Sequence, residues 1–162
     1  MVDFAPLTRL PKGALGILKE IARHLLKRPV VGICAVAQDE AGRVLLIRRG
    51  DTGEWALPGG TLEWGEELRP AIEREIHEET GARVETIGRL SGVYSRPDRD
   101  PRFHAVTVCV LATIRGPIDG PKNTLEVREV KLFAASDLPP NLCMGMDDML
   151  RDALANKPPV LE

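Results

Sequence analysis

The sequence predicts an α/β domain with a mixed sheet, because apolar runs rich in β-branched residues alternate with segments of helical periodicity. The chain has 162 residues, of which 43% are hydrophobic and 28% are charged, so it can bury a core within one folded unit. No segment of the sequence repeats. We therefore expect one globular domain over residues 30–162, preceded by a helical extension over residues 1–29.

The N-terminal extension is predicted to contain an amphipathic helix over residues 11–27. Its apolar positions recur at helical spacing and its basic positions fall on another face; the apolar set is Leu15, Leu18, Ala22 and Leu25, and the basic set is Lys19, Arg23 and Lys27. Such a helix can lie on a membrane surface, but the same pattern suits packing on its own domain or on a second subunit. We favour packing, and we expect a homodimer.

Five segments are predicted to be β-strands. The first two, residues 30–37 and 43–49, are separated by turn-forming residues and should make a hairpin. The other three span residues 84–94, 104–115 and 129–134.

Two further helices are predicted, over residues 66–80 and 147–156, the second followed by a Pro-Pro tail. Two loops, residues 96–102 and 116–124, are rich in Pro, Gly, Asp and Arg. Because exposed loops between rigid elements often carry binding residues, both are candidates for substrate contact.

Charge and cysteine content narrow the classes of partner. A formal net charge of -2 gives no reason to expect a nucleic acid polymer or an anionic membrane as partner. The three cysteines form no CxxC pair, which suggests neither a disulfide framework nor a zinc site. The N-terminus lacks the apolar core of a secretory signal, so a cytoplasmic location is expected.

Residues 60–82 contain seven glutamates. On a helix, Glu75 stands three residues before Glu78 and four before Glu79, so the three carboxylates share one side. Like charges at this spacing destabilise a helix unless a cation offsets them, and a hard divalent cation prefers oxygen ligands. The alternative is an ordinary solvated acidic face.

The wider pattern around these glutamates resembles a known signature. The matching residues are Gly60, Glu66, Arg74, Glu75, Ile76, Glu78, Glu79 and Gly81. They correspond in register to the Nudix box, G-x5-E-x7-R-E-U-x-E-E-x-G-U, and only Ala82 departs, because the family usually has a larger aliphatic residue there. The resemblance covers residues 30–138 and implies the Nudix α/β/α sandwich and hydrolysis of a pyrophosphate bond.

The resemblance also implies roles for individual residues. The implied metal ligands are Gly59, Glu75, Glu78 and Glu79, holding Mg²⁺ or, in its place, Mn²⁺. The implied structural residues of the box are Gly60, Glu66, Arg74 and Gly81, with Arg74 holding Glu66 and Glu75. Nudix enzymes take the catalytic base from the box or from a later loop, so the candidates here are Glu78, Glu79, Glu126 and Glu129.

Residues 93–104 resemble the corresponding stretch of ADP-ribose and nucleotide-sugar pyrophosphatases, which implies a small-molecule nucleotide substrate. Arginine forks can bind phosphate, and an aromatic ring can stack on a base. The expected substrate contacts are Arg49, Trp55, Tyr94, Arg96, Arg102 and His104. The alternative for the loop is a solvated segment whose arginines pair with Asp98 and Asp100. The alternatives are a pyrophosphohydrolase of nucleoside triphosphates or dinucleoside polyphosphates, and a sensor that binds its nucleotide without cleaving it.

Overall fold

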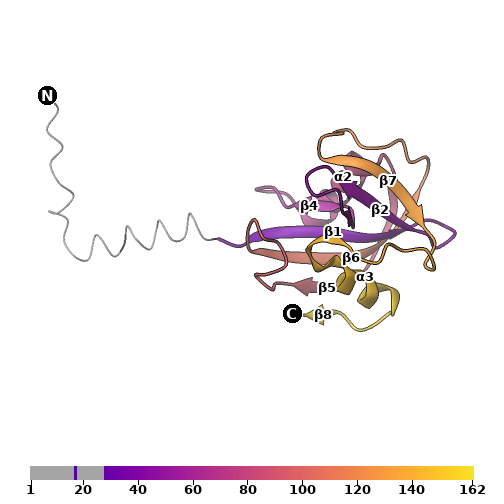
Figure 1. Cartoon of the computed structure of the whole chain (residues 1–162). Coiled ribbons are helices and arrows are strands. Elements are labelled where there is room, and N and C mark those ends of the chain that lie inside the picture. Colours follow the sequence, from indigo (N-terminus) through magenta and orange to yellow (C-terminus); the bar gives the residue numbers. More distant parts are fainter. Residues whose placement is uncertain (1–16, 18–27) are drawn as a thin grey trace, which may run out of the picture.

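The computed structural model describes Ile17 and residues 28–162, drawn in colour in Figure 1. Apart from Ile17, the helix predicted over residues 11–27 lies outside the described residues. Within the part of the chain that the structure describes, no helix is long and apolar enough to cross a membrane.

A single mixed sheet organises the domain. Its strands are β1 (Val30–Gln38), β2 (Val44–Arg49), β3 (Trp55–Ala56), β4 (Gly59–Thr61), β5 (Arg83–Tyr94), β6 (Ala105–Arg115), β7 (Val127–Phe133) and β8 (Val160–Leu161). The order is β3-β2-β1-β6-β5-β8, while β4 pairs with β1 and β7 pairs with β2. The β1–β6 and β5–β8 pairs are parallel, and the others are antiparallel. The five predicted strands are confirmed, including the hairpin of β1 and β2.

Two helices cover opposite faces of this sheet, α2 (Leu68–Thr80) and α3 (Met146–Leu154), as Figure 1 shows. Successive side chains of β1 point to opposite faces of the sheet and so belong to two separate parts of the core. Ile33 and Ala35 pack on the α2 side, whereas Cys34 and Val36 pack on the α3 side. The expected α/β/α sandwich with a mixed sheet is therefore confirmed.

Helix α2 begins and ends where its sequence allows. Pro70 falls in the first turn, where a missing backbone N–H costs nothing. Gly81 ends the helix in the left-handed conformation, with φ of 76°, and its N–H donates to the carbonyl of His77 at 2.9 Å. The helix starts at Leu68, two residues after the start predicted at Glu66. The side chain of Glu66 is instead paired with Arg74.

The C-terminal region differs from the sequence prediction. Helix α3 is preceded by a 3-10 turn, η2 (Cys143–Gly145), in which Met144 has a φ of 58°, and α3 ends at Leu154 rather than at residue 156. The Pro-Pro tail leads into β8, which pairs with Gly92 and Val93 of β5. A strand of two residues is too short to show any periodicity in sequence.

Candidate functional site

A cavity of about 490 Å³ opens between α2, β4 and the loops at the ends of β2 and β5. Its lining includes Gly59, Gly60, Glu75 and Glu79 from the box region, Arg49 from the end of β2, Asp51, Asp100 and Arg102 from two loops, and Leu125 and Glu126 from the segment before β7. Its apolar side chains include Ile47, Phe103, Met144 and Met146. The structure thus brings acidic box residues and two arginines into one cavity.

Packing of α2 on the sheet aims the box carboxylates at this cavity. Ile72 and Ile76 are buried, at 3% and 1% exposure, and fix the rotation of the helix. Glu75 and Glu79, four residues apart, then face β4, where the Gly59 N–H donates to Glu79 Oε2 at 2.8 Å. A Cβ atom at Gly60 would clash with the Glu75 carboxylate, so only glycine permits this close approach.

Arg74 ties three box glutamates together. Its guanidinium donates to both Glu66 oxygens, at 2.9 and 3.0 Å, and to Glu75 Oε1 at 2.9 Å. Its Nη1 also lies 3.4 Å from Glu78 Oε2, and Lys122 Nζ lies 3.5 Å from Glu78 Oε1. Hydrogen bonds to Glu66 and Glu75 raise the Arg74 pKa, so this cation stays charged throughout the usable pH range.

Among the described carboxyl groups, Glu79 is the one whose anionic form is least stabilised by its surroundings. Burial raises its pKa to about 8, and the hydrogen bond from the Gly59 N–H opposes this only in part. Burial also raises the pKa of Glu75, while Arg74 acts in the opposite direction. Burial therefore disfavours the anionic form of both carboxyl groups.

These donors suit a hard divalent cation. Within residues 28–162, no three Asp, Glu, His or Cys side chains already converge on one point that would hold a metal ion. The carboxylates of Glu75 and Glu79 and the backbone of Gly59 nevertheless line the same cavity, and oxygen donors of this kind are the ligands that Mg²⁺ prefers. Glu78 does not line the cavity; its carboxylate is turned toward Arg74 and Lys122.

The pKa of Glu79 predicts how stability depends on pH when metal is chelated. The folded protein retains this proton up to about pH 8, whereas an ordinary Glu loses it near 4.5, so stability should fall as pH rises through this window. One pKa unit corresponds to about 1.4 kcal/mol, and solvent screening at this partly buried group leaves roughly 2–3 kcal/mol of loss. Denaturant unfolding with a chelator, at several pH values, measures it.

Glu79→Gln should flatten this pH dependence, because the amide does not titrate. Glu73→Gln is the matched control, since Glu73 is exposed on the same helix and lies outside the cavity lining. Equal slopes for the wild type and Glu79→Gln would show that Glu79 does not hold a proton in the folded state.

The two arginines that line the cavity are already paired with aspartates. Arg49 donates to both Asp51 oxygens, at 2.9 and 2.7 Å, and Arg102 donates to both Asp100 oxygens, at 3.0 and 2.8 Å. Arg102 Nη1 also lies 3.3 Å from Asp51 Oδ2, which joins the two pairs. Hydrogen bonds from Arg49 lower the pKa of Asp51 to about 2.

The two later glutamates proposed as catalytic bases are placed differently. Glu126 lines the cavity, and its backbone carbonyl accepts a 2.6 Å hydrogen bond from the Gly50 N–H, next to Arg49. Glu129 lies on β7 outside the cavity lining, with Oε2 at 3.5 Å from Nη1 of Arg48. Of these two, only Glu126 can face a substrate in the cavity.

Four of the expected substrate contacts do not reach the cavity. Trp55 packs edge-on against Phe133 at a centroid distance of 4.9 Å and contributes to the core. Tyr94 is 1% exposed, and its hydroxyl lies 3.4 Å from Asp152, so its ring has no free face for a base. His104 Nε2 lies 2.9 Å from the Ser95 carbonyl.

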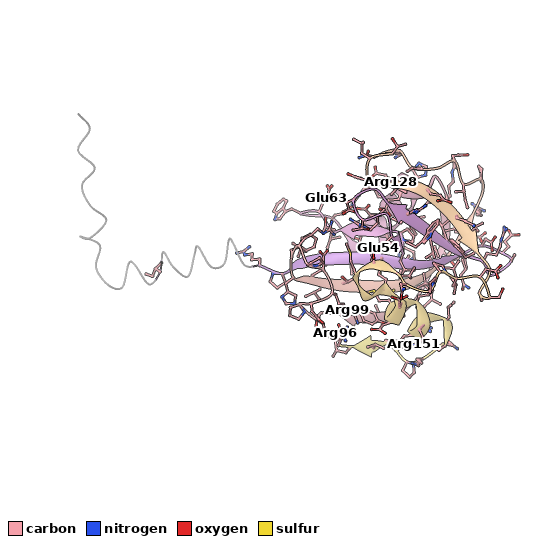
Figure 2. The ribbon with its side chains drawn as sticks, in the orientation of Figure 1. Glu54, Glu63, Arg96, Arg99, Arg128 and Arg151 are labelled. Carbon is pink, nitrogen blue, oxygen red and sulfur yellow. The ribbon has the colours of Figure 1, made fainter. Side chains whose placement is uncertain are left out.

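Arg96 also lies outside the cavity, beside Arg99 in Figure 2, where the C-terminal residue holds the loop. Arg96 Nε is 3.5 Å from Glu162 Oε1. The Glu162 carboxylate further accepts the backbone N–H groups of Ser95 and Arg96 at 2.9 and 3.0 Å, and Arg99 Nη2 at 2.7 Å. These arginines therefore anchor the loop rather than offer free donors to a phosphate.

Sequence reasoning missed several residues of the cavity, among them Asp51, Phe103 and Met144. Asp51 and Asp100 lie 49 positions apart in sequence, and only the folded loops bring both to the cavity. The alternative expected for the loop is present, because Arg102 pairs with Asp100 and Arg96 Nε lies 3.6 Å from Asp98 Oδ1. No spacing in the sequence distinguishes Asp51 or Met144.

The comparisons with known proteins agree with this geometry. The family model described as NUDIX domain matches residues 26–153. An ADP-ribose pyrophosphatase of Methanocaldococcus jannaschii is 35% identical over 133 residues, which is 80% of this chain and 75% of that protein. A putative 8-oxo-dGTP diphosphatase of Bacillus subtilis is 39% identical over 73 residues, 45% of this chain and 48% of that protein, so this chain spans about half of its length.

Among solved structures, a MutT NUDIX hydrolase from Burkholderia pseudomallei matches with a TM-score of 0.68 and 32% identity, covering 78% of this chain and 98% of that one. The family model covers most of the chain, and the residues of the box line or support one cavity. This chain belongs to the Nudix family, as a pyrophosphohydrolase.

Proposed function

We propose that this chain hydrolyses the pyrophosphate bond of ADP-ribose or a nucleotide sugar, giving a nucleoside monophosphate and a sugar phosphate. The observation that carries the proposal is that Glu75, Glu79, Arg49 and Arg102 line one cavity. The full-domain likeness to an ADP-ribose pyrophosphatase supports this substrate class over the half-length likeness to a putative 8-oxo-dGTP diphosphatase.

The reaction requires neutralisation of a diphosphate and a water molecule held in line with the scissile bond. We propose that Glu75 and Glu79, with the Gly59 carbonyl and Glu78, hold Mg²⁺ or Mn²⁺. The cation supplies charge neutralisation to the diphosphate oxygens. Glu78 would join this set only by turning away from Arg74 and Lys122.

The remaining steps fall to the protein's own side chains. We assign Glu126 as the group that accepts the proton from the attacking water, because it is the later-loop glutamate that lines the cavity. The water oxygen bonds to one phosphorus, the bridging P–O bond breaks, and the leaving phosphate carries away the bond's electrons. The N–H groups of Arg49 and Arg102 that do not bind the aspartates are free to donate to the phosphate oxygens.

Product release tests the proposal directly. A panel of ADP-ribose, nucleotide sugars, dinucleoside polyphosphates and deoxynucleoside triphosphates is incubated with Mg²⁺, with Mn²⁺ and with a chelator. Metal-dependent release of AMP from ADP-ribose, or of the matching products from a nucleotide sugar, is the expected result. Cleavage of triphosphates alone would overturn the substrate, and tight binding without turnover would indicate a sensor.

The assembly and location of the protein are proposals as well. We propose a homodimer, in which the extension over residues 1–29 supplies an apolar helical face, and a cytoplasmic location. Sedimentation of the full chain and of a chain lacking residues 1–27 tests the first, because an unchanged mass would exclude that role of the extension.

Arg102→Ala should raise KM for the preferred substrate by roughly tenfold or more with a smaller change in kcat, because a charge-assisted hydrogen bond to phosphate contributes about 1.5–3 kcal/mol. Steady-state kinetics measure this. Arg128→Ala is the matched control: Arg128 is exposed on β7, apart from the 95–104 loop in Figure 2, and lies outside the cavity lining. A KM that changes equally in both variants would show that Arg102 does not contact the substrate.

A further inference from the structure

The charged residues that line the cavity besides the glutamates form a network with no surplus positive charge. They are two arginines and two aspartates: Arg49, Asp51, Asp100 and Arg102. Each guanidinium meets one carboxylate through two hydrogen bonds, and the contact between Arg102 and Asp51 joins the pairs. The formal charges of this four-residue network sum to zero.

The two aspartates differ in what they can offer a ligand. Asp100 is buried, at 7% exposure, and its oxygens accept from the guanidinium and the backbone N–H of Arg102. The oxygens of Asp51 likewise accept from the Arg49 guanidinium and from the Thr52 N–H at 2.8 Å. The side chain of Asp51 is 46% exposed, however, and its further contact to Arg102 is the longest of the network at 3.3 Å. A ligand hydroxyl can therefore reach Asp51 and displace Arg102 from it.

A neutral network with alternating donors and acceptors suits hydroxyl groups better than an extended phosphate chain. A hydroxyl can accept from an arginine N–H while donating to a neighbouring carboxylate, so two adjacent hydroxyls fit an alternating pair. The terminal phosphates of a triphosphate carry negative charge and donate nothing, so they are repelled by an exposed carboxylate that is already ionised.

We propose that Asp51 is a specificity-determining residue that accepts a hydrogen bond from a sugar hydroxyl and disfavours a triphosphate at the same position. The inference rests on the proposed function and adds to it the residue that recognises the adjacent hydroxyls of the sugar beyond the scissile bond. Arg49 and Arg102, oriented by the aspartates, donate to the same group or to the phosphate next to it.

The test compares Asp51→Asn with the wild type on ADP-ribose and on ATP. Asparagine keeps the size of the side chain but removes its negative charge, so the net charge of the four-residue network becomes positive. We expect kcat/KM for ADP-ribose to fall about tenfold and kcat/KM for ATP to rise severalfold. Asp98→Asn is the matched control, because Asp98 is exposed in the same loop as Arg102 and lies outside the cavity lining.

The outcomes separate the inference from the function on which it rests. If the wild type hydrolyses ADP-ribose and Asp51→Asn has the same ADP-ribose to ATP ratio as Asp98→Asn, the proposed function stands and the role of Asp51 is wrong. If the wild type prefers ATP, the neutral network does not select against triphosphates, and the inference is overturned. A wild type that neither hydrolyses nor binds ADP-ribose would reject both. Thermal unfolding of each variant verifies that the fold is intact.

Discussion

Glu79→Gln is expected to lower kcat by about 10³-fold, the largest effect of any single substitution in the cavity. Glu79 is a partly buried carboxylate that contacts Gly59 and lines the cavity, and burial raises its pKa more than that of Glu75. Glutamine preserves its size and one oxygen but removes the negative charge that would hold a divalent cation. Initial rates across a series of Mg²⁺ concentrations measure the loss.

Glu73→Gln serves as the control for this substitution, because it removes one carboxylate from the exposed side of the same helix. It should leave kcat and the Mg²⁺ dependence close to the wild-type values. A near-normal rate of Glu79→Gln at low Mg²⁺ would show that Glu79 is not a metal ligand.

The second large expected effect distinguishes Glu126 from Glu129, the two candidate bases that follow the box in the sequence. Glu126→Gln should lower kcat by about 10²-fold or more, because a general base contributes at least that factor and Gln cannot accept the proton. Glu129→Gln should act almost like the wild type, since Glu129 lies on β7 beside Arg48 and outside the cavity lining. The measurement is kcat/KM as a function of pH for both variants.

In Glu126→Gln the acid limb of this pH profile should disappear along with the rate. If the rate falls but the profile keeps its shape, Glu126 contacts the substrate without acting as the base. If Glu126→Gln retains a normal rate, the base belongs to the box instead.

The sequence predicted best those parts of the site that one helix determines. The spacing of Glu75, Glu78 and Glu79 places them on one side of α2, and the apolar positions Ile72 and Ile76 fix the side that faces the sheet. Spacing did not reveal which way each carboxylate turns. Glu79 faces Gly59, whereas Glu78 faces Arg74 and Lys122, and these contacts depend on residues far away in the sequence.

The substrate contacts expected from residues 93–104 were harder to predict, because the register of β5 on β6 decides which face of the sheet a side chain such as Tyr94 points to. The pairing of β5 with β6 shifts register at three places between Val84 and Gly92. Each such irregularity can turn the following side chains to the other face of a sheet. Alternation counted along the sequence therefore could not show that Tyr94 faces the core, where it is 1% exposed.

The loop over residues 95–104 is held by contacts within the protein itself, because Glu162 binds Ser95, Arg96 and Arg99 at one end of it. At the other end Asp100 fixes both the backbone and the guanidinium of Arg102. A binding loop that is already fixed loses little conformational entropy when the ligand binds, so more of the contact energy remains as affinity. We therefore expect recognition by Arg102 to resemble a rigid fit rather than a closure of the loop around the substrate.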